Sequence, residues 1–519
     1  MRRALNPMCP VGWAVVTLVG VAIVAIVLGL GLLDRLGSGA DVIDNAKPAF
    51  TDARVTGARA GIDAISVAVD TADPIVTEQG GAAAEVPQLI AFVSKQTGLA
   101  EADVLAALQQ NFPHTTALLQ ATPLSSVSAE LPKLVTLLST VLEITPEEVG
   151  AALQQSFPRL AQAVGALPAV TAGWDAVPGI EGLTRFDGTP VTDVKGIRDY
   201  FGADVIPTVE RNRENFQQLD DWVPVRVVAP LLLVVGIVVI LWGAWFLVRS
   251  VMGKLRLGES MFGWLIVPVV GLAVVLLVGL WNLFPALEGG QAMVEDLRPV
   301  FADARIQADT PAISMVSTVV DLLDPITTEA GGAAAEVPQL VAFVSQQTGL
   351  AEADVLATLQ QEVPRTAALL TALPLSAVSA ELPQLTAFLS DTLGLSPDEL
   401  TAALQGSFPR LAQSIASLPV LTTAWDALPN ADGFTRFDGT PITNVTGARD
   451  YFGADVIPML AASQRDFYAL DEPPSLNLFA PLLSAIGGIV LVFGLFMLLR
   501  HDVSVRTSRM ARERLRLGS

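Results

Sequence analysis

Residues 77–110 read TEQGGAAAEVPQLIAFVSKQTGLAEADVLAALQQ, and residues 328–361 repeat this stretch almost unchanged as TEAGGAAAEVPQLVAFVSQQTGLAEADVLATLQQ. The same offset of 251 residues relates TRFDGTP at Thr184 to its copy at Thr435. Self-similarity at a fixed offset indicates a chain built from repeated structural units. We therefore interpret the sequence as an internal tandem duplication, with a first half and a second half of the same design.

A shorter repeat lies inside each half. Pro87 and Pro132, which are 45 residues apart, both follow A-E-[VL], and Phe112-Pro113 recurs as Phe157-Pro158. Short periods of this kind are typical of stacked supersecondary units that share a core. The pattern predicts helices punctuated by proline, and the helical spacing of leucine, valine and phenylalanine favours packing between helices over a ligand pocket.

Four apolar runs without a charged residue are long enough to cross a membrane: Val11–Leu33, Val227–Val248, Trp264–Phe284 and Phe479–Leu499. At ~1.5 Å rise per residue, each run spans the ~30 Å hydrocarbon core as a helix. The mean hydropathy of +0.52 and the hydrophobic content of 51% agree with this interpretation. The predicted fold class is an all-α membrane protein with four transmembrane helices.

Charge is distributed unevenly between the segments that the spans separate. Residues 1–10, 249–263 and 500–519 carry net charges of +2, +2 and +4, whereas residues 34–226 and 285–478 carry −12 and −17. Because basic segments stay on the cytoplasmic side, we predict a cytoplasmic N-terminus, loop and tail, and two homologous helical extracytoplasmic domains. Arginine greatly outnumbers lysine, a bias common in high-GC bacterial genomes, so the expected location is the plasma (inner) membrane of a bacterium.

Local signals predict several helix ends in the two extracytoplasmic domains. Thr145–Glu148 and Ser396–Glu399 fit the capping box, each with a proline at the first helical position. Gly98 fits a helix stop, and Pro87 is expected in the first turn of its helix.

Longer helices are expected at the two ends of each domain. In the first half, one begins near Phe50 and ends at Asp73-Pro74, and the glycines of residues 37–39 are expected to separate it from the span. Gly289-Gly290 takes the same role in the second half. A final helix should run from near Tyr200 towards Trp222.

The sequence lacks the groupings on which common catalytic and metal sites depend. Its histidines, His114 and His501, and its single cysteine, Cys9, are far apart, and no nucleophile-elbow, Walker or dinucleotide motif is present. Paired carboxylates such as Glu147-Glu148 fit a helix N-terminus, where they favour the helix dipole. We therefore predict no enzyme activity, no cofactor and no metal.

Two further classes are disfavoured by charge. The net charge of −21 argues against nucleic acid as a partner, because phosphate binding needs a basic surface. The apolar runs contain no ionisable residue, which argues against a proton or ion path through the membrane.

One motif of each predicted domain is a candidate partner contact. Arg185, Phe186 and Asp187 recur as Arg436, Phe437 and Asp438, and Asp-Gly followed by proline indicates an exposed tight turn. Arginine and aromatic residues often anchor interfaces. The alternative is structural: Phe186 would fill a local core, while Arg185 would pair with Asp187 or Asp199.

The leading functional hypothesis is a non-enzymatic integral membrane protein of the cell envelope. It would scaffold or bind a protein partner, or a second copy of itself, through the duplicated acidic domains. The alternative is the binding or transfer of an apolar ligand such as a lipid, because short, proline-broken helices rich in alanine, valine and leucine can separate to form a groove.

Overall fold

The computed structural model describes residues 8–77, 81–220, 225–252, 257–280, 282–328, 332–473 and 475–517. Within these residues the regular structure is helical, and strand-like pairing is limited to isolated bridges from Thr184 to Pro190 and from Thr435 to Pro441. The prediction of an all-helical chain is therefore confirmed. The chain forms two compact units, and each unit takes segments from both halves.

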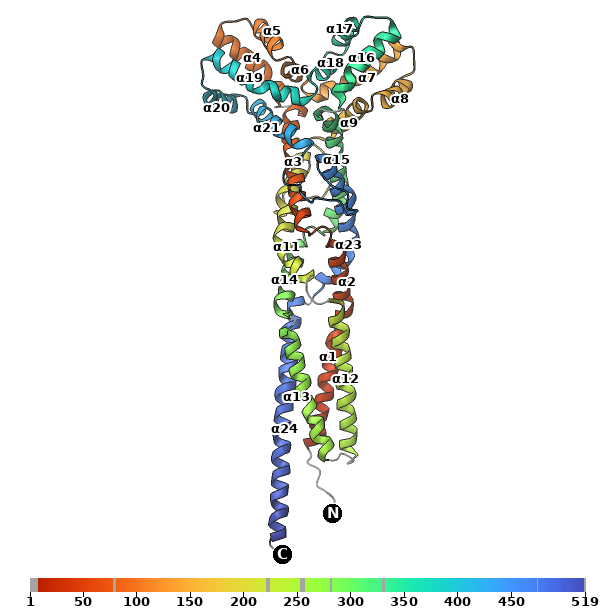
Figure 1. Cartoon of the computed structure of the whole chain (residues 1–519), viewed down its shortest axis with the longest axis vertical. Coiled ribbons are helices and arrows are strands. Elements are labelled where there is room, and N and C mark those ends of the chain that lie inside the picture. Colours follow the sequence, from red (N-terminus) through yellow and green to blue (C-terminus); the bar gives the residue numbers. More distant parts are fainter. Residues whose placement is uncertain are drawn as a thin grey trace. The chain divides into compact units, whose positions relative to one another are not determined.

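The first unit, here called the apolar unit, comprises residues 1–50, 208–301 and 459–519. Its helices are α1 (Met8–Gly29), α2 (Leu32–Ala46), α12 (Val225–Val251), α13 (Leu257–Leu280), α14 (Leu283–Leu297), the 3-10 helix η3 (Leu476–Leu478), α24 (Phe479–Leu517) and most of α11 (Ile206–Asp220) and α23 (Ile457–Asp471). Helix α1 lies along α12, and α13 lies along α24 (Figure 1).

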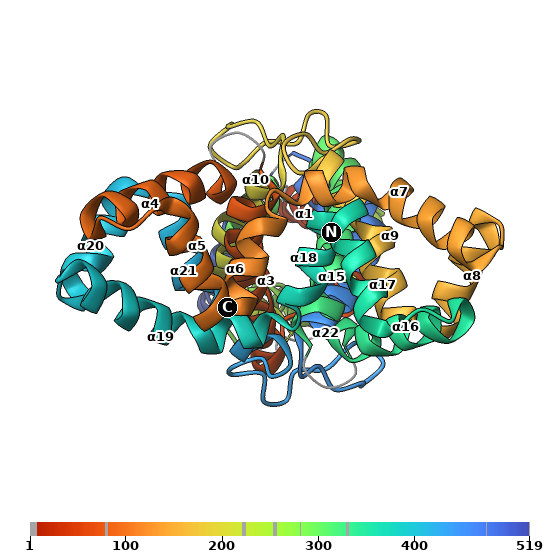
Figure 2. The ribbon, with the colours of Figure 1, turned by 90° about the horizontal axis from the view of Figure 1, so that it is seen from above.

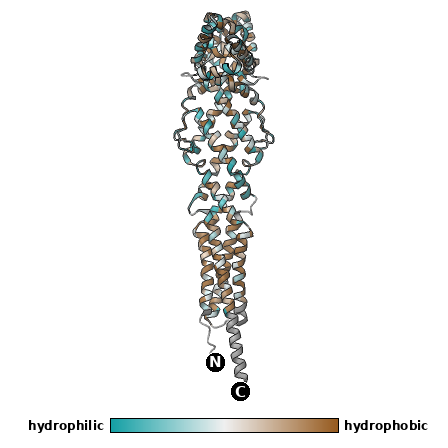
Figure 3. Ribbon diagram, turned by 90° about the vertical axis from the view of Figure 1, so that its left-hand side faces the viewer, coloured by the Kyte–Doolittle hydropathy of each residue, from teal (hydrophilic) through white to brown (hydrophobic). Residues whose placement is uncertain are grey.

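Four single helices of the described residues are long and apolar enough to cross a membrane: α1 over Pro10–Gly29, α12 over Val227–Val251, α13 over Phe262–Leu280 and α24 over Phe479–Arg500. They form the continuous hydrophobic part of the ribbon in Figure 3. The prediction of four apolar spans is thus confirmed at the level of helix length and composition.

Glycines bring the helices of each pair into backbone contact. A Cβ atom on Gly20 of α1 would lie 3.0 Å from the carbonyl oxygen of Gly236 in α12. The equivalent pair repeats this approach, since a Cβ on Gly271 of α13 would lie 2.8 Å from the carbonyl oxygen of Gly487 in α24. Small residues at such crossings allow close helix packing where no water is present to drive association.

The first and third apolar runs are each divided between two helices. Gly31, with φ of 59°, separates α1 from α2, and Asn282, with φ of 47°, separates α13 from α14. Glycine and asparagine are the residues that most readily adopt this left-handed conformation. The expected breaks further along are wrong, because α2 runs through residues 37–39 and α14 runs through Gly289-Gly290.

The second unit, here called the lobed unit, comprises residues 51–207 and 302–458. Its first-half helices are α3 (Asp52–Val76), α4 (Ala82–Thr97), α5 (Glu101–Asn111), α6 (Pro113–Ala121), α7 (Leu124–Leu142), α8 (Pro146–Ser156), α9 (Pro158–Gly173), α10 (Val194–Asp199) and the π-helix η1 (Tyr200–Val205). Its second-half helices are α15 (Asp303–Thr327), α16 (Ala333–Thr348), α17 (Glu352–Glu362), α18 (Pro364–Ala372), α19 (Leu375–Leu393), α20 (Pro397–Ser407), α21 (Pro409–Trp425), α22 (Val445–Asp450) and η2 (Tyr451–Val456). Each first-half helix starts 251 residues before its counterpart.

One bent pair of this unit also passes the apolarity test. Helices α18 and α19, which meet at 81°, would count as a fifth span if they were taken together. In the lobed unit, however, α18 packs against α6, and α19 packs against α4. Their apolar side chains are therefore part of the core of this unit.

The local helix signals have mixed outcomes. Both capping boxes are confirmed, with the N–H of Glu148 donating to Thr145 Oγ1 at 3.3 Å and the same arrangement at Ser396. Gly98 caps the end of α4 with φ of 73°, as predicted. The first-turn placement of Pro87 is wrong, because α4 starts at Ala82. Three consecutive alanines, which are strong helix formers, extend the helix upstream of the proline.

The terminal helices of the first half run slightly beyond their expected ends. Helix α3 continues past Pro74 to Val76. The closing helical segment begins at Val194, where the Asp193 carboxylate accepts from the Gly196 N–H at 2.6 Å, and passes through η1 into α11. Trp222, the expected end, lies outside the described residues.

The two halves interleave within the lobed unit. Helix α3 packs against α21 of the second half, and α15 packs against α9 of the first. At a further contact between the halves, a Cβ atom on Gly57 of α3 would overlap the ring of Phe434, which follows α21, whereas the equivalent positions carry Ala308 and Leu183. Glycine thus faces phenylalanine in one pair, and alanine faces the smaller leucine in the other. In place of one domain for each half, both halves build a single unit.

Candidate functional site

The lobed unit contains two equivalent groups of helices, here called the first and second lobes (Figure 2). The first lobe joins α4, α5 and α6 to α19, α20 and α21, and the second joins α7, α8 and α9 to α16, α17 and α18. Each lobe therefore takes one short repeat from each half. Helices α6 and α18 pack against each other and connect the two lobes.

Glutamates of the A-E-[VL]-P motif join the halves in the first lobe. The Glu85 carboxylate accepts from the backbone N–H groups of Arg410 and Leu411 at 3.2 and 2.9 Å. In return, the Glu381 carboxylate accepts from the N–H groups of His114 and Thr115 at 3.2 and 2.8 Å. Helices α21 and α6 each begin with proline, so these are the next free N–H groups, and a carboxylate is favoured at this positive end of a helix.

The second lobe repeats the exchange with the remaining pair of short repeats. The Glu336 carboxylate accepts from the N–H groups of Arg159 and Leu160 at the start of α9, at 3.2 and 2.8 Å. The Glu130 carboxylate accepts from the N–H groups of Arg365 and Thr366 at the start of α18, at 3.0 and 2.9 Å. In the shorter repeat, the A-E-[VL]-P motif thus supplies a carboxylate, and the motif with the second proline supplies the helix N-terminus that a carboxylate caps.

An apolar cavity of about 60 Å³ lies inside the first lobe, between the helices that the two halves contribute. Its walls include Leu89 and Val93 from α4, Leu385 and Leu389 from α19, and Leu411 from α21. These side chains are buried. Leucine and valine in the lining make the surface almost wholly hydrocarbon, so water in the cavity would find few hydrogen-bond partners.

An equivalent apolar cavity of about 50 Å³ lies inside the second lobe. Its walls include Leu340 and Val344 from α16, Leu134 and Leu138 from α7, and Leu160 from α9. Each of these positions is offset by 251 residues from one in the first lobe. The sequence indicated these residues as packing side chains, which they are, but the helices that carry them leave a space between them.

A leucine at the edge of the second cavity connects it to the surface. Leu350 lines the cavity and is 45% exposed, and its counterpart Leu99 at the first lobe is 49% exposed. Each follows a glycine that ends a helix, and its carbonyl accepts a hydrogen bond at 2.6 Å from a serine of that helix, Ser94 or Ser345. The turn therefore holds an apolar side chain in an exposed position, where covering it would remove apolar surface from water.

The first candidate partner turn is held by contacts within the chain. Arg185 donates to the Asp204 carboxylate at 2.9 and 3.0 Å, with Asp199 farther away at 3.9 Å. The guanidinium of Arg305, from α15, donates to the carbonyl of Arg185 at 2.9 Å and lies 5.1 Å from the centroid of the Phe186 ring. Phe186 is half-buried.

The second candidate turn repeats this arrangement. Arg436 donates to Asp455 at 2.8 Å, and Arg54 of α3 lies 5.3 Å from the centroid of the Phe437 ring. Asp187 and Asp438 remain exposed, and each accepts from a backbone N–H of its own turn, which lowers the pKa of its carboxyl. Arg54 and Arg305 lie outside the motif that predicted these turns. Their shared offset of 251 residues is a signal that could have found them.

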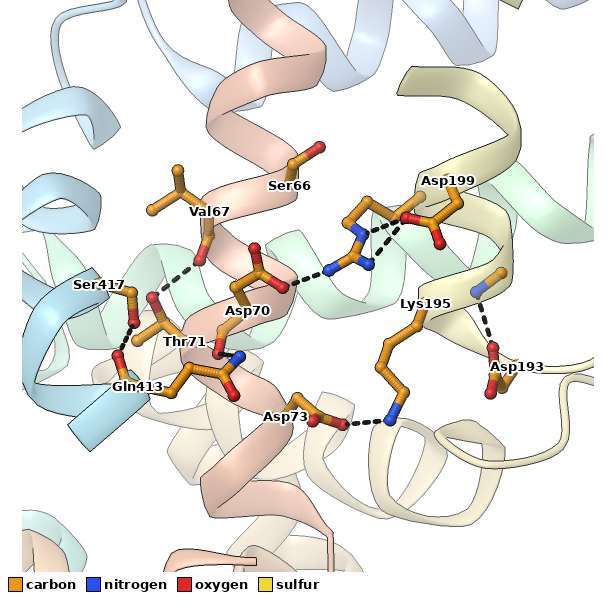
Figure 4. A network of polar contacts seen from close by, with 12 residues as sticks. Ser66, Val67, Asp70, Thr71, Asp73, Asp193, Lys195, Asp199, Gln413 and Ser417 are labelled. Carbon is orange, nitrogen blue, oxygen red and sulfur yellow. Dashed lines mark hydrogen bonds and ion pairs between the residues drawn. The ribbon is translucent and has the colours of Figure 1, made fainter. Parts of the chain in front are cut away.

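The buried Asp73 carboxylate of α3 contacts residues of both halves, and Figure 4 shows its ion pair with Lys195. Asp73 is 2% exposed and receives Trp174 Nε1 at 3.0 Å, Lys195 Nζ at 3.1 Å and Arg410 of the second half at 2.7 Å. Burial alone would raise the pKa of Asp73, but the hydrogen bonds from Trp174 and Lys195 and the charge of Arg410 lower it. Asp324 has the equivalent place beside Trp425 and Arg159. Carboxylates saturated with donors in this way are structural anchors.

The described residues contain no candidate metal centre, and comparison with known proteins finds no relative of the chain. Among the described residues, no three histidine, cysteine, aspartate or glutamate side chains are grouped so that they could hold a metal ion. No protein-family model matches the sequence, and comparisons with curated proteins and with solved structures find no match.

Proposed function

We propose that this chain is a membrane-anchored protein that binds an apolar ligand, such as a hydrocarbon chain of a lipid, in the two lobes of its acidic helical unit. The observation that carries the proposal is the pair of equivalent apolar cavities, with an exposed leucine at the edge of the second cavity and at the matching position of the first lobe.

The two cavities lower the stability of the lobed unit. At ~24 cal/mol per Å³, a cavity of this size destabilises the unit by about 1 kcal/mol. Both lobes leave this space open at matching positions. A ligand that enters the space replaces the missing dispersion contacts.

A ligand larger than the cavities requires the lobes to widen. Each cavity lies between helices of different halves, and the reciprocal glutamate caps hold these helices only at their ends. An acyl chain is larger than 60 Å³, so binding requires the apolar side chains along the seam to move apart while the caps stay in place. Non-directional leucine contacts tolerate such repacking.

The charge of the unit restricts the class of ligand. Residues 51–207 and 302–458, which make up the lobed unit, carry net charges of −10 and −13, so an anionic headgroup would be repelled from its surface. An uncharged or zwitterionic lipid fits better. With the basic termini in the cytoplasm, the lobes lie on the outer face of the membrane, and the ligand is a lipid of the envelope.

Cavity-filling substitutions test the proposal. Val93→Phe and Val344→Phe place a ring in the first and second cavities, and Val420→Phe adds the same ring at a position of α21 that is 53% exposed. Full-length protein is extracted from its own membrane and its native mass is compared with 54.5 kDa. We expect lipid-sized excess mass in the wild type and the Val420→Phe control, and in the double variant a loss of the part of this mass that belongs to lipid in the lobes. A lipid-free wild type overturns the proposal.

Partner binding at the two turns is a second candidate, favoured by the exposed carboxylates of Asp187 and Asp438 at equivalent positions. Both arginines of these turns already bind carboxylates of the chain itself. The carboxylates are therefore the groups to change. Under this proposal, excess mass of a whole protein disappears in an Asp187→Lys, Asp438→Lys variant, while lipid-sized mass remains.

A further inference from the structure

We propose that a hydrocarbon chain of a bilayer lipid occupies a separate site among the four apolar helices. A cavity of about 200 Å³ lies between the α1–α12 pair and the α13–α24 pair. This site lies in the apolar unit and does not depend on ligand binding by the lobes, so either proposal stands if the other fails.

The lining of this cavity is entirely hydrocarbon in character. Its walls include Val16 and Ile23 from α1, Val239 from α12, Val274 from α13 and Val490 from α24, and no polar surface faces the space. A dry apolar cavity of ~150 Å³ accepts a benzene-sized molecule. The larger space between the helix pairs therefore accommodates a segment of an acyl chain.

The cavity exists because the helices meet in two different ways. Within each pair, glycines bring the backbones into contact, as at Gly20 with Gly236. Between the pairs, contact depends on large rings: Trp13 of α1 stacks on Trp264 of α13 at 4.2 Å between centroids, and Phe246 of α12 stacks on Trp13 from within its own pair at 4.6 Å. Next to these rings the facing side chains are mostly valines, which are too short to close the separation that the rings set.

The expected source of the bound hydrocarbon chain is the bilayer around the four apolar helices. Val238 lines the cavity and is also 55% exposed on the outside of α12, so the space has an opening on the lateral surface of the helices. In a membrane this surface faces acyl chains. Within lipid the hydrophobic effect does not pull helices together, so only packing contacts favour closing the gap. A neighbouring chain recovers the missing dispersion contacts by entering.

Photocrosslinking of the full-length protein tests this site. The protein is reconstituted in phosphatidylcholine vesicles doped with phosphatidylcholine that carries a diazirine at the middle of one acyl chain, and the labelled peptides are mapped by mass spectrometry. We expect label on inward positions of α12 and α13 such as Val239 and Val274, beyond the label on outward-facing residues.

Matched variants separate the cavity from the outer surface. Val239→Phe with Val274→Phe fills the cavity, whereas Val234→Phe with Val269→Phe adds the same rings at positions of the same helices that are each 58% exposed. Inward labelling should fall at least tenfold in the first variant and persist in the second, with both melting cooperatively. Wild-type label confined to outward residues overturns the proposal, as does inward labelling that the first variant leaves unchanged.

Discussion

At the scale of single residues, the two halves differ at a buried carboxyl group. Asp309 of α15 is 1% exposed, and the equivalent position in α3 is Ala58. Burial raises the pKa of Asp309 to about 7, against the opposing effects of a hydrogen bond from Tyr200 and of the charge of Arg305. Burial and the charge of Asp309 in turn raise the pKa of Tyr200.

The raised pKa of Asp309 predicts a fall in stability with rising pH. The folded protein retains a proton that the unfolded chain releases from its ordinary pKa of 3.8 upwards, so the free energy of unfolding decreases until pH passes about 7. Asp309→Ala should remove this dependence and raise stability at pH 8 relative to pH 4 by on the order of 3 kcal/mol.

Denaturant unfolding at several pH values in one detergent checks this prediction. Ala58→Asp is the matched control, because it places the same carboxyl in the equivalent position and should add a second fall in stability over the same pH range. Parallel pH profiles for wild type and Asp309→Ala would contradict the assignment.

A second prediction concerns the size match between Gly57 and Phe434. A Cβ at position 57 would overlap the Phe434 ring, which is 1% exposed, so Gly57→Ala should destabilise the protein by about 1–3 kcal/mol. Phe434→Leu should recover most of this loss, because Ala308 and Leu183 form the equivalent pair. Unfolding of the two single variants and the double variant measures the coupling, and additive losses would show that the two positions do not compensate.

At the scale of helices, the glutamate caps decide which elements pair. Replacing Glu85 and Glu381 by glutamine should cost about 1 kcal/mol for each cap, because the amide keeps the shape but loses the charge that favours a helix N-terminus. Glu362→Gln, at an exposed position at the end of α17, is the control and should change little. Equal unfolding midpoints for the cap variants and this control would count against a stabilising role.

The same scale shows which helix ends the sequence could predict. The capping boxes at Thr145 and Ser396 were predictable because donor and acceptor lie three residues apart. Glu85 was noted as part of a motif, but its partner lies 325 residues away at Arg410, and no local pattern identifies it. The breaks at Gly31 and Asn282 were missed because an apolar run gives no sign of where a single residue takes a left-handed conformation.

At the scale of the whole molecule, the sequence predicted the repeat and the apolar spans but not how the halves combine. Both halves carry the same glutamates and the same proline-started helices, so Glu85 could cap α9 of its own half as well as α21 of the other. Near-identical repeats contain no preference between these pairings. The candidate cavities were unpredictable for the same reason, since they lie at a seam between halves.

This reciprocity predicts that the covalent link between the halves is dispensable for pairing. Chains comprising residues 1–254 and 255–519, produced together, should copurify at the 54.5 kDa mass of the whole protein, because every glutamate cap of the lobes crosses between the halves. Native mass spectrometry measures the complex. In the first chain, the substitutions Glu85→Lys and Glu130→Lys remove two of the four glutamate caps. They should reduce the fraction of paired chains severalfold. A first chain that remains a lone monomer beside the second would show that the halves are held together by their connection and not by the exchange of caps.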